Sequence, residues 1–254
     1  MRNVDLFNRE ILSGSVADLH ETVLDLELSQ SAFFCNVHML MLSQENSVLA
    51  RAMDRAQMVF PDGAPIAWLQ RRMGYSQSHV LRGYEAVEIL CADAAANNDR
   101  IGLYGSTDFV LDALVMQLSY RFPGLQIEFV TSPRQFSVSE IALEKSLVSE
   151  INAKNLRYLF VGLGCPKQEI WIDRYADELN CSLLGVGAAF DWLAGTTSKP
   201  PGWMEKAGLA WLFRLIQNPG GMWHRYLIYN SKFIFQSLKL LILNRQSLPR
   251  ESNR

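Results

Sequence analysis

A single carboxylate, Asp62, stands between Pro61 and Gly63 directly after the apolar run at 57–60. A carboxylate at the end of a buried strand is partly desolvated, which suits a general base that removes a proton from a substrate. The ordinary alternative is that Asp62 caps a helix beginning near Ala64, and residue statistics alone favour that alternative. The sequence therefore offers one candidate base with a competing structural role.

Two other polar residues accompany apolar segments and could recognise a ligand. Asn36 lies near the end of the apolar run at 31–37, and its amide can donate and accept hydrogen bonds to a base, a ribose or a sugar. Arg82 precedes Gly83 and could contact a phosphate. The alternatives are a helix-capping asparagine and an exposed arginine with no role.

Two turns offer candidate phosphate contacts. Gly105 belongs to a turn of small residues, and backbone N–H groups at the following helix start could receive a phosphate, although any tight turn of this kind has the same form. Lys167 and Gln168 begin a helical pattern after 164–166 and could meet a phosphate or a sugar hydroxyl. The alternative for both is that they are polar residues exposed on a first helical turn.

Two Gly-x-Gly segments, at 162–164 and 185–187, follow apolar runs without completing a dinucleotide fingerprint. Lys167 and Phe190 stand where the third glycine belongs, and no acidic residue ends the next strand. These departures disfavour an NAD-linked oxidoreductase. The four histidines and four cysteines show no metal-ligand spacing and no Cys-x-x-Cys pair. We therefore expect no metal site, no cofactor and reduced cysteines.

Apolar runs of strand length alternate with helix-length patterns along most of the chain. The runs are nearly continuous in apolar residues, as strands buried on both faces are. The runs lie at 31–37, 57–60, 101–105, 126–130, 158–164 and 182–187, and the helical patterns at 39–55, 64–73, 84–97, 107–121, 138–154 and 167–179. The alternation predicts a Rossmann-like α/β fold, with a mostly parallel sheet covered by helices. Ligands bind outside the carboxyl ends of such strands, where several of the candidates fall.

Composition and charge divide the chain into a body and an appendage. The chain has 254 residues, a net charge of −2, 49% hydrophobic and 20% charged residues, which excludes a disordered protein. We expect an α/β catalytic domain at 1–198 and a helical appendage at 199–254, with helices at 203–217 and 222–243. The appendage has nine Lys/Arg, two Asp/Glu and three of the six tryptophans, a net charge of +7 against −9 for the body.

A basic, aromatic appendage on an acidic body suits an anionic partner. We expect the appendage to attach peripherally to an anionic membrane surface. The alternative is that it packs on its own body or on a neighbouring subunit and covers the site, which leaves a homo-oligomer open. The acidic body argues against nucleic acid. The first residues lack a signal-peptide core and no run approaches the ~18–20 apolar residues of a membrane span, which predicts a cytoplasmic protein.

Several segments together resemble the WecG/TagA/CpsF family of bacterial glycosyltransferases (glycosyltransferase family 26). The resemblance rests on Pro61-Asp62-Gly63, on VGLGCPKQEIW at 161–171 and on GVGAAFDWLAG at 185–195. The appendage adds matches that include Arg214, Pro219, Trp223 and Arg225-Tyr226-Leu227. The matching segments run from about residue 31 to 230, and the two long pieces make the resemblance specific.

This resemblance implies an activity and several residue roles. The family transfers a sugar from a UDP-sugar to an undecaprenyl-diphosphate-linked saccharide at the inner face of the cytoplasmic membrane, in exopolysaccharide, capsule or surface-glycan synthesis. The reaction is regarded as inverting and metal-independent, with the aspartate of the Pro-Asp-Gly motif, here Asp62, as base. Asn36 and Gln168 match polar positions, Gln168 near the donor. The family's appendage carries arginines that are thought to reach the donor diphosphate and to aid membrane attachment, and Arg214 and Arg225 are the ones that remain at those positions in this chain.

The chain departs from the family pattern at three places. Phe34 stands where many members carry a hydroxyl residue, and the stretch 220–224 lacks most of the usual arginines. Arg82 stands where a small or hydroxyl residue is common, so it could compensate. We predict a transferase of a hexose-type sugar. The alternative is a non-catalytic nucleotide-sugar-binding or assembly protein of a polysaccharide machine, which the appendage allows and the intact Pro-Asp-Gly motif argues against.

Overall fold

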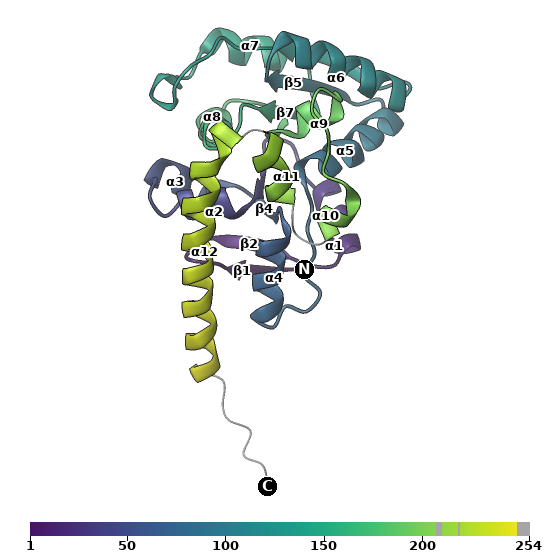
Figure 1. Ribbon diagram of the computed structural model, residues 1–254. Coiled ribbons are helices and arrows are strands. Elements are labelled where there is room, and N and C mark those ends of the chain that lie inside the picture. The colour runs from purple at the N-terminus through teal and green to yellow at the C-terminus, as the bar shows by residue number, and fades with distance from the viewer. Residues whose placement is uncertain (207–209, 218, 248–254) are drawn as a thin grey trace.

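A computed structural model describes residues 1–206, 210–217 and 219–247, with the backbone only at 205–206, 210, 214, 219, 221–222, 224–226 and 244–247. Six strands form one sheet in the order β4-β3-β8-β7-β5-β6, and all neighbouring strands are parallel (Figure 1). The strands are β3 (Ser31–Cys35), β4 (Met58–Pro61), β5 (Arg100–Gly105), β6 (Gln126–Thr131), β7 (Tyr158–Gly162) and β8 (Ser182–Gly185). The predicted α/β fold with a parallel sheet is confirmed.

The central strands are buried on both faces because alternate side chains enter two separate cores. In β3, Phe33 belongs to one core and Phe34 to the other. In β7, Leu159 joins the core of Phe33, and Phe160 joins the core of Phe34. This two-sided burial explains why these strands read as continuous apolar runs in the sequence.

Helices supply the other half of each core. The core that contains Phe33 receives side chains of α2 (Val37–Leu42), α3 (Ser47–Arg55), α4 (Ala64–Arg72), α7 (Lys145–Ala153) and α8 (Lys167–Tyr175). The core that contains Phe34 receives those of α1 (Val16–Leu24), α5 (Gly83–Asn97), α6 (Asp108–Arg121) and α9 (Ala189–Leu193). An antiparallel pair, β1 (Arg2–Asp5) and β2 (Glu10–Ser13), precedes the sheet and was not expected from the apolar runs.

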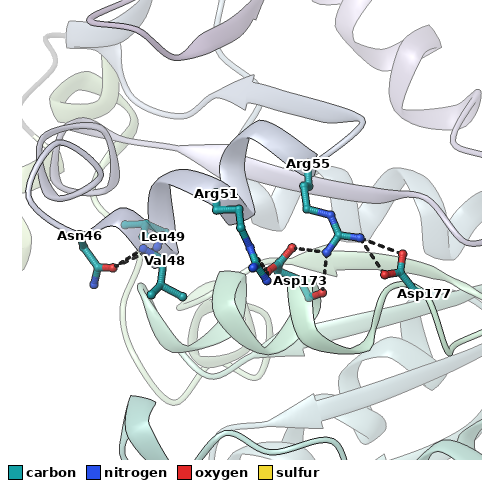
Figure 2. Close-up of polar contacts among 7 residues, drawn as sticks. All are labelled: Asn46, Val48, Leu49, Arg51, Arg55, Asp173 and Asp177. Atoms are coloured by element: carbon teal, nitrogen blue, oxygen red, sulfur yellow. Dashed lines mark hydrogen bonds and ion pairs between the residues drawn. The ribbon is translucent and has the colours of Figure 1, made fainter.

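Two predicted helices are interrupted. The pattern at 39–55 forms α2 and α3, because the side chain of Asn46 accepts hydrogen bonds from the N–H groups of Val48 and Leu49 at 3.1 and 3.0 Å and starts a new helix (Figure 2). The pattern at 138–154 forms a 3₁₀ turn, Val138–Glu140, and then α7. Just before α7, the N–H of Glu144 donates to the hydroxyl of Tyr175 at 3.0 Å.

The appendage is helical, as predicted. α10 (Gly202–Lys206) and α11 (Ala210–Gln217) lie in the region expected to be one helix, and α12 (Pro219–Ser247) extends the second predicted helix at both ends. Proline is favourable in the first turn of a helix, which suits Pro219 at this start. The division of the chain at 198 and 199 stays a prediction. None of the described helices is both long and apolar enough to cross a membrane.

One face of α12 is fixed on the body beside α2. The side-chain amides of Gln44 and Gln236 exchange hydrogen bonds at 2.8 and 3.0 Å. Phe233 is buried, and its ring meets that of Phe7 edge to face with centroids 6.2 Å apart. Figure 1 shows the far end of α12 extending beyond the body. One face of this helix therefore packs on the body of its own chain, as one of the two alternatives for the appendage predicted.

Candidate active site

The exits of β3 and β4 lie side by side at the carboxyl edge of the sheet, and a third segment joins them. Cys35 and Pro61 are register partners, and the N–H of Asp62 donates to the carbonyl of Cys35 at 2.8 Å. The N–H of Leu81 donates to the carbonyl of Pro61 at 3.0 Å. These two bonds bring the backbone at Asn36, Asp62 and Arg82 together, although the three are far apart in the sequence.

Asp62 does not cap the following helix. Gly63, whose φ is +104°, occupies the N-cap position of α4, and Asp62 precedes it. The alternative role that residue statistics favoured for Asp62 is therefore wrong. The carboxylate is partly buried. A partly buried carboxylate at a strand exit, outside the N-cap position, has the environment expected of a general base.

Cys35 lies beneath this carboxylate in the core. Burial raises the pKa of the Cys35 thiol well above 9.0, and the negative charges of Asp62 and Glu169 raise it further. The thiol therefore stays protonated near neutral pH and does not act as a nucleophile. The two charges that act on it come from the exit of β4 and from the first turn of α8, which places both carboxylates near the same buried sulfur.

Asn36 has a structural role as well as its predicted one. Its side-chain oxygen accepts a hydrogen bond from the N–H of Met39 at 3.1 Å and caps α2, so the capping alternative is confirmed. Within the described part of the chain, its amide N–H groups make no hydrogen bond. The cap uses only the acceptor, and the amide donors stay available for a ligand at the sheet edge.

Arg82 is not an exposed residue without a role. Its side chain is 18% exposed, and its guanidinium donates to Glu85 Oε1 at 3.0 Å. The backbone N–H of Arg82 donates to Glu85 Oε2 at 2.8 Å, which fixes the start of α5. A Cβ at Gly83 would lie 2.9 Å from the carbonyl oxygen of Val186, so α5 starts in close contact with the exit of β8. Arg82 is thus held beside Asp62 by its neighbours on the chain.

Gly105 allows β5 and β7 to approach each other closely. Its φ is +118°, and a Cβ there would lie 2.7 Å from the carbonyl carbon of Gly162. The N–H of Ser106 donates to the carbonyl oxygen of Gly162 at 3.1 Å. That amide is used inside the protein, so it is not one of the donors that the sequence offered to a phosphate. A ligand contact at Gly105 stays a prediction.

Gln168 faces the interior. It is 3% exposed, its side-chain oxygen accepts from the N–H of Gly164 at 3.1 Å, and its side-chain nitrogen donates to Glu169 Oε1 at 2.7 Å. A Cβ at Gly185 would lie 3.2 Å from the same nitrogen. Gln168 therefore holds the loop between β7 and α8 against the exit of β8. The alternative of an exposed first-turn residue is wrong for Gln168.

Glu169 is a buried residue beside Gln168 that the sequence analysis did not single out. Glu169 is completely buried, and its place in the segment PKQE was the available signal.

The predicted cations lie in different parts of the chain. The ammonium of Lys167 lies 5.6 Å from the centre of the Phe136 ring, in the segment that follows β6. Arg214 and Arg225 fall in α11 and α12, where the structure describes no side chain for either, so both stay predictions.

An ion-pair network fixes α8, the helix that carries Gln168 (Figure 2). Asp173 has a side chain only 3% exposed and binds Arg51 at 2.8 Å and Arg55 at 2.9 Å. Arg55 also binds Asp177 at 2.8 Å. Both arginines belong to α3, so the network joins α3 to α8, two helices of the core that contains Phe33.

Comparisons with known proteins identify the family of this chain. The model of the glycosyl transferase WecG/TagA/CpsF family matches residues 4–247. The chain belongs to this family. The chain is therefore a member of a glycosyltransferase family, and the resemblance carried by the Pro-Asp-Gly, PKQE and AFD segments is confirmed.

Three curated relatives carry the same name, N-acetylglucosaminyldiphosphoundecaprenol N-acetyl-beta-D-mannosaminyltransferase. The relative from Bacillus spizizenii is 24% identical over 217 residues, which cover 85% of this chain and 82% of the relative. The relative from Bacillus subtilis is 28% identical over 68% of this chain and 65% of its own length. A relative from Staphylococcus aureus is 25% identical over 65% of this chain and 63% of its own length.

Proposed function

We propose that this glycosyltransferase moves a hexose-type sugar from a UDP-sugar to an undecaprenyl-diphosphate-linked saccharide, in the synthesis of an exopolysaccharide, capsule or surface glycan. The names of the relatives support an acceptor of this class, since they act on N-acetylglucosaminyldiphosphoundecaprenol. The observation that carries the proposal is the placement of Asp62, which is partly buried and lies beside Asn36 and Arg82 at the sheet edge, one residue before the N-cap of α4.

The chemistry we propose is a single displacement with inversion. The Asp62 carboxylate takes the proton of the acceptor hydroxyl, and that oxygen forms a bond to the anomeric carbon. The bond from this carbon to the diphosphate oxygen breaks on the opposite side, and UDP leaves with the electron pair. General-base assistance of this kind contributes about 10²–10⁴-fold to the rate.

The departing diphosphate needs positive charge, which we assign to side chains. Arg82 is held near Asp62, and Lys167 starts α8 at the same edge of the sheet. Arg214 and Arg225 of the appendage are the other candidates from the sequence. Cationic side chains stabilise a departing diphosphate through charged hydrogen bonds. Within the described residues, no three His, Cys, Asp or Glu side chains form a group that could hold a metal ion.

We also propose peripheral attachment to the inner face of the cytoplasmic membrane through the appendage. The face of α12 that points away from the body carries large exposed apolar side chains at helical spacing: Trp223, Leu227, Ile234, Phe235, Leu238 and Ile242. We call these six residues the apolar stripe. The net charge of +7 at 199–254 favours an anionic leaflet, at about 1 kcal/mol for each basic residue near the surface.

The experiment that tests the transferase proposal is a transfer assay with the full chain. A panel of UDP-sugars, including UDP-N-acetylmannosamine, is offered with a lipid diphosphate-linked N-acetylglucosamine, with EDTA or with Mg²⁺, and products are identified by mass. We expect one donor to give a product in both conditions. We expect Asp62→Asn to keep the melting temperature and the shift caused by UDP while the rate falls by about 10²–10⁴-fold.

Several results would contradict parts of this proposal. A normal rate for Asp62→Asn removes Asp62 from the role of base, and a rate that disappears with EDTA and returns with Mg²⁺ contradicts metal independence. Binding of UDP without turnover of any donor would favour the alternative of a non-catalytic nucleotide-sugar-binding or assembly protein.

A further inference from the structure

Four side chains form a cluster outside the residues considered so far. Tyr84 and Trp192 meet edge to face with ring centroids 5.5 Å apart, and both rings are partly exposed. The ammonium of Lys199 lies 4.2 Å from the centre of the Tyr84 ring and 3.7 Å from Glu88 Oε1. We call Tyr84, Glu88, Trp192 and Lys199 the rim. They come from α5, from α9 and from the first residue of the appendage.

The rim borders the candidate active site. Tyr84 follows Arg82 and Gly83, which the bond from Leu81 to Pro61 and the contact with Val186 hold at the exits of β4 and β8. α9, which carries Trp192, begins four residues after β8 ends. The two aromatic rings therefore stand next to the edge of the sheet that carries Asp62.

The chemistry of the rim suits a sugar attached to a phosphate. Lys199 and Arg121 both pair with Glu88, so two cations share this one carboxylate, and Arg82 pairs with Glu85 nearby. Phosphate oxygens are acceptors that such cations bind. The C–H face of a pyranose ring is apolar and packs against an exposed aromatic ring, as other apolar groups do.

Apolar surface continues from the rim onto the appendage. Trp203 of α10 is 65% exposed and lies four residues beyond Lys199, and Ile216 of α11 is 68% exposed. The side chain of Gln217 donates to the carbonyl of Ser198 at 3.3 Å, which ties the end of α11 to the residue before Lys199. A ligand with a diphosphate-linked sugar at one end and a hydrocarbon tail at the other matches this order of surfaces, whereas a nucleotide sugar has no hydrocarbon tail.

We propose that the rim is the acceptor subsite: Trp192 and Tyr84 pack on the first sugar of the lipid-linked acceptor, and Lys199 binds its diphosphate. This inference rests on the proposed function, because it assigns that reaction's acceptor to one side of Asp62. The donor would then bind at the loops that follow β5 and β7. The occupant is therefore an N-acetylhexosamine joined through a diphosphate to an alkyl or prenyl chain.

The test measures both substrates separately in the full-length enzyme. A short-chain alkyl diphosphate-linked N-acetylglucosamine serves as acceptor, and its binding in the absence of donor is measured by calorimetry. We expect Trp192→Leu and Lys199→Met each to raise the KM and the Kd for this acceptor about tenfold, while the KM for the donor and the thermal shift with UDP change less than about twofold. Trp68→Leu, at a tryptophan of α4 that is 39% exposed, is the matched control and should change neither.

The outcomes separate this inference from the proposed function. If the wild-type enzyme binds the acceptor but transfers no sugar, the proposed function fails, and the calorimetry still tests the rim. The rim proposal is overturned if the wild type does not bind the acceptor. It is also overturned if the Trp192 and Lys199 variants bind the acceptor normally, or if their defect appears in the donor KM. Lys199 is exposed, so its variant tests the rim even if Trp192→Leu does not fold.

Discussion

The ion pairs that join α3 to α8 predict that removing their two arginines lowers the stability of the fold more than removing Asp173 does. Asp173 is 3% exposed, whereas Arg51 and Arg55 are 64% and 43% exposed. Without Asp173, water solvates the two arginines, so Asp173→Ala should cost only about 2 kcal/mol in lost charged hydrogen bonds. Without both arginines a buried carboxylate has no cation, and Arg51→Met with Arg55→Met should cost about 3–5 kcal/mol.

A triple variant tests whether the unpaired Asp173 carboxylate causes this loss of stability. Adding Asp173→Leu to the two methionine substitutions removes the stranded charge and replaces it with an apolar side chain, so about 2–3 kcal/mol of the loss should return. Asp177→Asn is the control, because Asp177 is 74% exposed and its pair with Arg55 contributes less than about 1 kcal/mol.

Thermal and urea unfolding measure these differences. For a chain of this size, about 4 kcal/mol corresponds to a fall in melting temperature of roughly 8–16 °C. The reasoning is refuted if the double arginine variant is no less stable than Asp173→Ala, or if the triple variant is no more stable than the double. Because Gln168 lies in the first turn of the helix that this network fixes, the double variant should also turn over more slowly below its melting temperature.

Three other predictions concern close packing, membrane contact and buried thiols. Gly105→Ala should cost about 3 kcal/mol and most activity, because a Cβ would lie 2.7 Å from backbone at a φ of +118°. Gly74→Ala, at a φ of +102° with nothing within 4 Å, should cost only about 1 kcal/mol, and equal melting temperatures would contradict the packing argument. Leu238→Asp, in the apolar stripe, should reduce flotation with anionic vesicles; unchanged flotation removes the stripe from the membrane contact. Burial raises the pKa of Cys91 and of Cys181 to about 12 from 9.0, so the folded state keeps protons that the unfolded chain loses, and the free energy of unfolding should fall as pH rises above about 9. Urea unfolding at pH 8 and pH 10 measures this fall, which should be smaller in a Cys91→Ala and Cys181→Ala double variant than in the wild type. An equal fall in both proteins would contradict this cause.

The sheet was predictable because its sequence signal is local. A strand buried on both faces must be apolar at nearly every position, and the runs around Phe33 and Phe160 show this directly. The interruption before Asn46 was harder to foresee, since apolar spacing continues on both sides of it and only the side-chain cap of Asn46 marks the start of the second helix. The β1–β2 pair has four-residue strands, which carry too little periodicity to be recognised.

The candidate site was predictable only in part, for a different physical reason. Asp62, Asn36 and Arg82 each follow or accompany a strand exit, and topology alone brings such positions together. The inward orientation of Gln168 depends on contacts with Gly164 and Gly185, which no local pattern reveals. The rim depends on three segments that meet only in the folded chain, so none of its pairings could be expected from spacing.

The two faces of α12 link the proposed membrane contact to the site. The buried face is fixed through Phe233 and through the pair of Gln44 and Gln236, next to the helix that Asn36 caps. A helix of 29 residues is about 43 Å long, so it can reach from the body to a surface well away from it. If the apolar stripe lies in the headgroup layer, this fixed docking sets the height of Asp62 above the membrane. The acceptor sugar, held at the surface by its lipid, would then meet the base at a defined distance, which a freely hinged appendage would not provide.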